Sequence, residues 1–339
     1  MPSLSTREGV VVIESNIFGS TGRTVTRIGF GGAPAGLTNY LGTYSPEQLD
    51  QREQVIAAIQ HAADRGVTYF DTAAAYGSGQ SERIFGEALG GRVTRPTDVL
   101  FGGLVAPDPV GIEESPETTA GDSGSLPPHA IDTDPEPIFL ATKVSHKESD
   151  VRGSVERSLR NLRVDRIDLV QIHGGSYTEA DEARVLERGG VLDILEKARD
   201  EGLIRHIGFT TEDQNAAVYR FIATGRFEVM QVQYNLLFQH PYSPDRPFGC
   251  MIAARDAGMG IVTMRSLTSG VFQRWMQMLR PGDNFDYSAA LLQFVLSNPL
   301  VNVALAGMRT ASEVDRNITV LNDAAGRIDL DGLHQKYVQ

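Results

Sequence analysis

The strongest constraint on the fold is an alternation of helix-like and strand-like segments along most of the chain. The strand-like segments are short apolar runs, and the helix-like segments carry apolar residues at helical spacing. Gly66, Gly202 and Gly258 each lie between a helix and the following strand, where a C-terminal helix cap is expected. The predicted strands cover residues 27–31, 67–71, 138–143, 167–173, 203–209, 228–233, 259–264 and 301–306.

Helices are predicted in the intervals between these strands. They cover residues 47–65, 81–89, 150–162, 190–201, 212–224, 247–257 and 287–297, and a last helix starts near Thr310. Eight strands that alternate with eight helices favour an α/β fold of the (β/α)8 TIM-barrel type over a doubly wound sheet. A length of 339 residues suits one such barrel, so we predict a single domain over residues 1–339.

Two segments depart from the alternation. Apolar and polar residues alternate over residues 10–30 on both sides of the turn at 19–22, which predicts an N-terminal β-hairpin before the barrel. Residues 92–137 interrupt the pattern between the second helix and the third strand. This insertion holds 8 of the 16 prolines and contributes −7 of the net charge of −12, so its composition favours an irregular segment.

Composition argues against several classes of protein. The negative net charge opposes non-specific nucleic-acid binding, and no apolar run approaches the length of a membrane span. Cys250 is the single cysteine, which excludes an internal disulfide and fits a reducing compartment. The first residues lack the apolar core of a signal peptide. We therefore expect a cytoplasmic protein without nucleic-acid or membrane partners, and its oligomeric state stays open.

Four ionisable residues of four types are predicted to meet at one rim of the barrel. Asp71, Lys143 and His173 each close a predicted strand, and Tyr76 follows on the loop after Asp71. In such barrels the carboxyl ends of the strands carry the active site. An ammonium group lowers the pKa of a neighbouring tyrosine, and a carboxylate holds the ammonium in place. The set suits proton transfer to a carbonyl oxygen that gains negative charge.

The chain resembles the aldo-keto reductase superfamily over roughly residues 20–325, apart from the insertion. The segment FDTAAAYGSGQSE at 70–82 matches the most specific family motif, and ATK at 141–143 and DLVQIH at 168–173 match the next two. The resemblance implies a catalytic tetrad of Asp71, Tyr76, Lys143 and His173. It also implies an NAD(P)H cofactor extended across the barrel mouth, with hydride passing to the carbonyl carbon and Tyr76 supplying the proton.

The same resemblance implies the cofactor-binding residues. Gln231 matches the glutamine that holds the carboxamide of the cofactor. Thr210 and Thr211 stand where most members of the family have Ser-Asn. Met264 replaces an aromatic residue that often stacks on the nicotinamide. The loop that crosses the pyrophosphate corresponds to Arg265, Ser266, Leu267, Thr268, Ser269 and Gly270. The residues at the adenosine end correspond to Gly307, Arg309, Glu313 and Asn317.

Among these, Arg309 and Asn317 match the family, whereas Glu313 replaces an arginine and Gly307 a lysine of many NADP-specific members. Because a guanidinium suits a 2′-phosphate, Arg309 favours NADP(H), with NAD(H) as the alternative. The GGAPAG cluster at 31–36 resembles a dinucleotide fingerprint only loosely, since Pro34 stands at the place of the third glycine, and we do not assign it to the cofactor.

The predicted function is oxidoreduction of a small aldehyde, ketone or sugar, and three alternatives stay open. A Schiff-base aldolase could use Lys143 as the nucleophile, but it leaves Tyr76 and Gln231 without a role. A regulatory subunit could bind the cofactor and turn over slowly. A metal-dependent hydrolase is disfavoured because the seven histidines are scattered, and we predict no metal site. Candidate pocket walls are Tyr40, Tyr177, Phe238, Phe272 and Trp275.

Overall fold

Eight parallel strands close into a barrel, which confirms the predicted (β/α)8 fold. The computed structural model describes residues 13–92, 138–242, 248–282, 284–330 and 332. The strands follow one another around the ring in chain order, and the last pairs with the first. They are β3 (Ile28–Gly31), β4 (Tyr69–Asp71), β5 (Phe139–Ser145), β6 (Ile167–His173), β7 (Ile204–Thr211), β8 (Val229–Gln233), β9 (Gly260–Met264) and β10 (Val303–Gly307).

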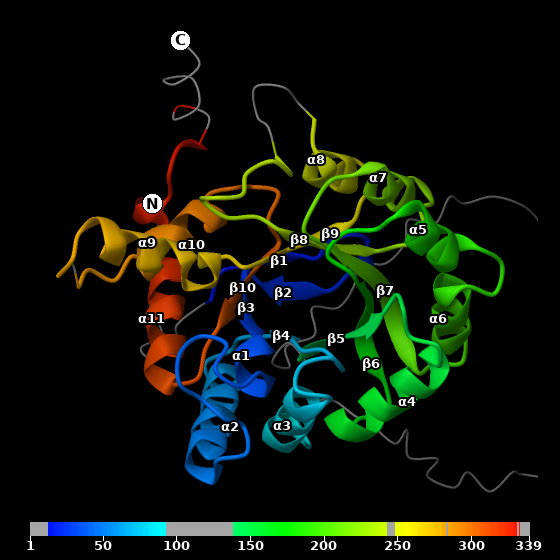
Figure 1. Cartoon of the computed structure of the whole chain (residues 1–339), viewed down its shortest axis with the longest axis horizontal. Helices are drawn as coiled ribbons and strands as arrows, with labels where there is room; N and C mark the ends of the chain where they lie inside the picture. Colours follow the sequence, from blue (N-terminus) through cyan, green and yellow to red (C-terminus); the bar gives the residue numbers. More distant parts are fainter. Residues whose placement is uncertain (1–12, 93–137, 243–247, 283, 331, 333–339) are drawn as a thin grey trace, which may run out of the picture.

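Helices surround the barrel on all sides (Figure 1). They are α1 (Ala33–Gly36), α2 (Leu49–Asp64), α3 (Gln80–Leu89), α4 (Val151–Leu162), α5 (Glu179–Leu186), α6 (Val191–Asp200), α7 (Ala216–Ala223), α8 (Cys250–Asp256), α9 (Val271–Leu279), α10 (Ser288–Leu296) and α11 (Ala311–Asn322). Each predicted helix overlaps one of these. The backbone of Gly66, Gly202 and Gly258 has positive φ, as the predicted caps require.

Three helices, α1, α5 and α9, lie outside the predicted helix ranges. Helix α5 follows β6 and begins with a capping box, in which the Thr178 and Asp181 side chains each bind the other residue's backbone amide. Helix α1 is a single turn within the GGAPAG segment, where Pro34 occupies one of the first helical positions. Helix α1 follows directly on β3, and α5 follows β6 after a short loop; the apolar period of these two short segments is too brief to detect.

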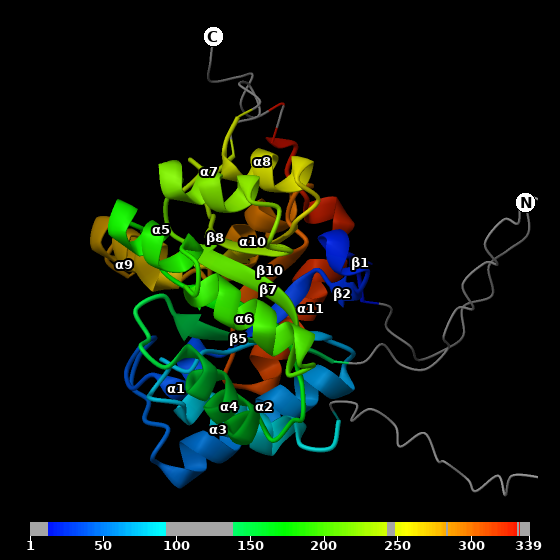
Figure 2. The same cartoon turned by 90° about the vertical axis from the view of Figure 1, so that its right-hand side faces the viewer.

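The predicted N-terminal hairpin is present and closes one end of the barrel. Strands β1 (Ser15–Ile17) and β2 (Thr24–Thr26) pair antiparallel, and Figure 2 shows them at the end opposite α9. Phe18, between them, is fully buried and packs edge-on against Tyr69 and Phe139 inside the barrel. A Cβ atom on Gly260 would lie 2.5 Å from the Phe18 ring, so this seal needs glycine at that position.

The core has two apolar layers because successive strand residues point to opposite faces. One layer fills the barrel and includes Tyr69, Phe139 and Leu169. The other lies between the strands and the helices and includes Phe70, Leu140 and Val170. The strands therefore form a packed cylinder whose open end carries the polar residues described below.

The insertion predicted at 92–137 lies outside the described residues except for Arg92. It joins the end of α3 to the start of β5, and the start of β5 lies at the end of the barrel that the hairpin closes. Within the described part of the chain, no helix has both the length and the apolar character to span a membrane.

Candidate active site

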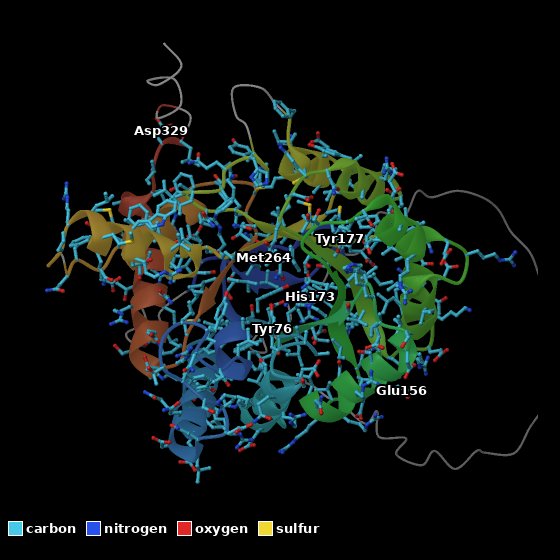
Figure 3. All side chains as sticks on the ribbon, in the orientation of Figure 1. Tyr76, Glu156, His173, Tyr177, Met264 and Asp329 are labelled. Atoms are coloured by element: carbon cyan, nitrogen blue, oxygen red, sulfur yellow. The ribbon has the colours of Figure 1, made fainter. Side chains whose placement is uncertain are left out.

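A cavity of about 500 Å³ opens at the carboxyl ends of the strands. Because parallel strands of a closed barrel end at the same rim, residues from distant parts of the chain meet there. In Figure 3 the labelled Tyr76, His173 and Met264 lie near the centre of the ring, whereas Glu156 and Asp329 lie outside it. The predicted residues that line the cavity are Asp71, Tyr76, His173, Thr210, Gln231, Met264, Arg265, Ser266, Leu267, Ser269, Gly270 and Gly307.

Asp71 and Lys143 form a buried ion pair at the floor of this cavity. The exposed fraction is 2% for Asp71 and 1% for Lys143. Lys143 Nζ binds Asp71 Oδ1 and also donates to the backbone carbonyl of Thr72 at 2.7 Å. Burial is the largest single influence and would lower the pKa of Lys143, but Asp71 and Tyr76 together outweigh it, so the pKa is raised and the ammonium form is kept. A fixed positive charge therefore lies beneath the cavity.

The Tyr76 loop is held in place by hydroxyl groups behind it. Thr72 donates a hydrogen bond to the Ser81 hydroxyl at 2.8 Å, and Ser81 donates to the Gly32 carbonyl at 2.9 Å. These bonds fasten the start of α3 and the end of β4 to the end of β3. The loop between them is thus short and anchored on both sides, which places Tyr76 at the rim.

Tyr76 stands between Lys143 and His173. Lys143 Nζ lies 5.0 Å from the centre of the Tyr76 ring, and the rings of Tyr76 and His173 meet edge to face with centroids 5.8 Å apart. Burial raises the pKa of Tyr76, and the Lys143 charge lowers it by less. The predicted influence of the ammonium thus has the expected sign, but the net direction is opposite because desolvation of a phenolate is costly.

His173 is the last residue of β6 and is neutral at physiological pH. Burial lowers its pKa to about 4, and the charge of Lys143 acts in the same direction. Its backbone carbonyl lies 2.8 Å from Nδ1 of His146, a residue that also lines the cavity. A neutral imidazole can donate one hydrogen bond to an oxygen beside Tyr76 without adding a second positive charge.

Gln171 is a buried polar residue of the site that was not among the predicted residues. Its Nε2 lies 3.2 Å from Asp71 Oδ2 and 2.9 Å from Gln231 Oε1. The signal was its position two residues before His173 on one strand, which places both side chains on the same face. Gln231 Nε2 in turn lies 3.7 Å from the Met264 sulfur.

Other predicted residues do not line the cavity. Lys143 lies beneath it, and Thr211, Thr268, Arg309, Glu313 and Asn317 are likewise not among its lining residues. The Arg309 guanidinium lies over the Tyr44 ring at 4.3 Å and donates from Nε to the Pro34 carbonyl at 3.2 Å. Glu313 Oε2 accepts the backbone amides of Arg309 at 2.7 Å and Thr310 at 3.0 Å, so this carboxylate caps α11.

Several lining residues lay outside the predicted site. The glycine-rich segment that we had not assigned to the cofactor contributes Gly31, Gly32, Ala33 and Pro34, because it follows directly on β3. Glu212, just after β7, pairs with Arg265 at 2.6 Å across the rim. Of the candidate walls Tyr40 lines the cavity, with its hydroxyl 3.2 Å from that of Ser269. Tyr177, Phe238, Phe272 and Trp275 are not among the lining residues.

The chemistry of these residues fits a nicotinamide dinucleotide. The Gln231 amide offers a donor at the deep end, Met264 offers an apolar side, and Arg265 offers a cation on the wall. The loop from Arg265 to Gly270 contributes all of its residues except Thr268 to the lining. Among the residues that the structure describes, no group of three or more metal-binding side chains is assembled.

Two curated proteins are similar to this chain in sequence over most of its length. The sequence is 24% identical to a D-threo-aldose 1-dehydrogenase of a Pseudomonas species, with 88% of this chain and 90% of that protein covered. It is 23% identical to L-galactose dehydrogenase of Arabidopsis thaliana, with 92% and 89% covered.

Solved structures have the same fold. An aldo-keto reductase from Bacillus halodurans in its holo form aligns with a TM-score of 0.64 at 18% identity, covering 94% of each chain. An aldo/keto reductase from Klebsiella pneumoniae, solved with NADP and acetate, aligns with a TM-score of 0.61 at 20% identity, covering 96% of this chain and 94% of that one.

A family model assigns the chain. The model described as the Aldo/keto reductase family matches residues 27–101 and 129–289, well over half of the sequence. The gap between the two matched ranges falls within the predicted insertion. The chain therefore belongs to the aldo/keto reductase family of NAD(P)-dependent oxidoreductases.

Proposed function

We propose that this protein interconverts a small carbonyl compound and its alcohol with NADP(H), using Tyr76 as the general acid and base. The observation that carries the proposal is the position of the Tyr76 phenol. It lines the cavity between a buried ammonium group and a neutral imidazole, with the ring of His173 at 5.8 Å and Lys143 Nζ at 5.0 Å.

The side chains divide the work of carbonyl reduction. When bound, the cofactor supplies the hydride that reaches the carbonyl carbon. The substrate oxygen lies between Tyr76 and His173, where the imidazole donates a hydrogen bond and the phenol donates the proton. As that proton leaves, the developing phenolate is stabilised by the Lys143 ammonium, which Asp71 holds in position. In the oxidative direction the same phenolate accepts the proton.

The cofactor assignment has two supports. The lining residues fit a dinucleotide, and the Klebsiella pneumoniae structure of this fold contains NADP. We propose that Gln231 holds the carboxamide and that Thr210, Met264 and the 265–270 loop contact the rest of the molecule. The Thr210 hydroxyl already donates its hydrogen to the Gly174 carbonyl at 2.6 Å, so it can meet the cofactor only as an acceptor or by contact. The adenosine end then lies near Gly307, Arg309 and Asn317.

The substrate that we propose is a small polar carbonyl compound or sugar. Two of the curated relatives are a dehydrogenase of an aldose and a dehydrogenase of L-galactose. The rim of the cavity combines Glu212, Arg265 and His146 with apolar Leu37 and Leu41. Such a mixed wall suits a hydroxylated molecule that presents one apolar face.

A substrate screen tests the proposal. Aldehydes, ketones and sugars are offered with NADPH and NADH, and oxidation or reduction of the nicotinamide is followed by its absorbance. With the best substrate, Tyr76→Phe should lose at least about 100-fold in kcat, which is typical of a positioned acid. Cofactor affinity should change little. A Tyr76→Phe protein that turns over at the wild-type rate would contradict the proposed role.

The Schiff-base alternative is disfavoured by the charge of Lys143. A nucleophilic lysine needs a free amine, and this site instead raises the pKa of Lys143. Borohydride should therefore fail to attach a carbonyl substrate to the protein. The regulatory alternative predicts tight cofactor binding with slow turnover for every substrate, so measuring affinity and kcat in the same screen separates it from the proposed function.

A further inference from the structure

Gln171 occupies the centre of the barrel beneath the cavity. Its side chain is fully buried, and it does not line the cavity itself. Nε2 donates to Asp71 Oδ2 at 3.2 Å and to Gln231 Oε1 at 2.9 Å. One amide nitrogen thus joins the residue that holds Lys143 to the glutamine assigned to the cofactor.

The chemistry of the partners fixes the orientation of both amides. An ionised carboxylate only accepts hydrogen bonds, so the Gln171 nitrogen must face Asp71. The second hydrogen of that nitrogen then goes to Gln231 Oε1. Because Oε1 of Gln231 is taken, its Nε2 is the donor that remains at the cavity. It lies 3.7 Å from the Met264 sulfur, and its hydrogen bond to Asp71 acts against the burial that raises the pKa of that carboxyl.

Gln171 is also a costly residue to bury. Its Oε1 has no hydrogen-bond partner within the described part of the chain. A buried acceptor without a partner destabilises a fold, whereas an apolar side chain of similar volume would not carry this cost. One step closer to the hairpin, the inward-facing residues Phe139 of β5 and Leu169 of β6 are apolar, whereas Gln171 lies level with Lys143 of β5. A role other than packing therefore explains glutamine at this position.

We propose that Gln171 is a positioning residue that aligns the Gln231 amide for the nicotinamide carboxamide and couples it to the Asp71–Lys143 pair. This proposal rests on the proposed function, because it requires the cofactor to bind at Gln231. Gln171 acts through Gln231 and Asp71 and does not touch the reacting atoms. Its effect is therefore expected first in cofactor affinity and only secondarily in kcat.

The test compares NADPH dissociation constants measured by fluorescence titration. Gln171→Met removes both donated hydrogen bonds and keeps the volume of the side chain. We expect its dissociation constant to rise about tenfold, the scale of one lost hydrogen bond. Gln231→Met should weaken binding by at least as much. The double variant should bind no more weakly than Gln231→Met alone, because a residue that acts through Gln231 has nothing left to align.

Gln293→Met is the matched control. Gln293 lies on α10, is also buried, and donates from Nε2 to the carbonyls of Val320 and Asp323, both at 3.0 Å. The same substitution there removes the same number of donated bonds outside the barrel. It should lower the melting temperature and leave the NADPH dissociation constant unchanged, which separates alignment of Gln231 from general stability.

A second variant keeps the test decisive if Gln171→Met does not fold. Gln171→Glu preserves the size, and the introduced carboxyl can donate a hydrogen bond only when protonated. Its NADPH affinity, relative to wild type at each pH, should improve as the pH falls. A merely structural role would leave this ratio independent of pH, and such a result would contradict the proposal.

The outcomes distinguish this proposal from the proposed function. Wild-type protein that binds neither NADPH nor NADH would contradict the function itself. If the wild type binds and Gln171→Met binds equally well, or if the double variant shows additive losses, only the role of Gln171 is overturned. Unchanged binding by Gln231→Met would overturn the placement of the carboxamide and, with it, the alignment by Gln171.

Discussion

At the scale of residues, the site combines groups whose charges are set by burial and by one another. Lys143 keeps its proton because Asp71 lies against it, and His173 loses its proton because it is buried near a cation. Such opposed shifts within one cluster are typical of acid–base chemistry. They also give measurable consequences for single substitutions.

Lys143→Met should slow turnover by at least about 100-fold and shift the alkaline limb of the pH–rate profile to higher pH. The reason is that the Lys143 charge lowers the pKa of Tyr76 against the effect of burial, and removing it leaves burial unopposed. The profile of kcat for carbonyl reduction from pH 6 to 11 measures the shift. Asp71→Asn should change the profile in the same direction by less.

Lys147→Met is the control for that experiment, because Lys147 is exposed on the loop after β5. It should retain the wild-type rate and profile. An alkaline limb that stays at the same pH in both Lys143→Met and Asp71→Asn would contradict the electrostatic role of the pair.

His173 should make stability depend on pH in a mildly acidic range. Its pKa is about 4 in the folded protein and about 6.5 unfolded, so the unfolded chain binds the extra proton between these values. Stability from this group is complete above pH 6.5 and is lost as the pH falls toward 4. When the pH falls from 6 to 5, the free energy of unfolding, measured with urea, should decrease by about 1 kcal/mol more for the wild type than for His173→Gln. His240→Gln, at an exposed histidine, should lose as much as wild type.

At the scale of elements, the N-terminus of α11 decides how the adenosine end can be recognised. A helix N-terminus attracts anions, and here Glu313 already occupies it through the amides of Arg309 and Thr310. A cofactor phosphate near this point would meet a carboxylate of like charge. In this chain the N-terminus of α11, which would otherwise favour a phosphate, is therefore already occupied by the Glu313 carboxylate.

Glu313→Gln should raise the preference for NADPH over NADH about fivefold. The amide keeps an oxygen for the capping bonds and removes a charge worth about 1 kcal/mol at close range in water. The dissociation constants of both cofactors give this ratio. Asp315→Asn on the same helix is the control, because Asp315 pairs with His61 of α2 and with Arg65, which follows α2 directly. A wild-type protein that binds NADH more tightly would reverse the NADP(H) proposal and make Glu313 the selecting residue.

At the scale of the whole molecule, the two ends of the barrel have different tasks. The hairpin closes one end with Phe18, and the cavity opens at the other. The predicted insertion at 92–137 begins after α3 and ends at β5, on the side of the hairpin. The family match also omits residues 102–128, which lie within it. We therefore propose that the insertion supplies no catalytic group.

Replacing residues 106–136 by a short Gly/Ser linker tests that proposal. The variant should fold and keep kcat within about threefold of wild type, because loops that leave this end of a barrel serve stability rather than catalysis. Size-exclusion chromatography checks the oligomeric state. If the state is unchanged and turnover still falls by more than about tenfold, equivalent to 1.4 kcal/mol of barrier, the insertion reaches the cavity.

The barrel and the residues at its rim could be predicted from local sequence patterns. Apolar periodicity and glycine caps are local properties, so the strands from β3 to β10 could be predicted within a few residues. Parallel strands in a barrel end on one side, so Asp71, Tyr76, Lys143 and His173 could be expected to meet without knowledge of their contacts. The family motifs around 70–82 and 168–173 added the chemistry that such a set performs.

The connections between these groups and their charge states depend on contacts that form when the chain folds. Gln171 lies 100 residues from Asp71 and 60 from Gln231, and no local pattern encodes a bond between them. Glu313 is bound to backbone amides, and the Arg309 guanidinium lies over Tyr44. Burial and through-space charge set the pKa of Tyr76 and of His173, and both depend on which side chains pack together after folding.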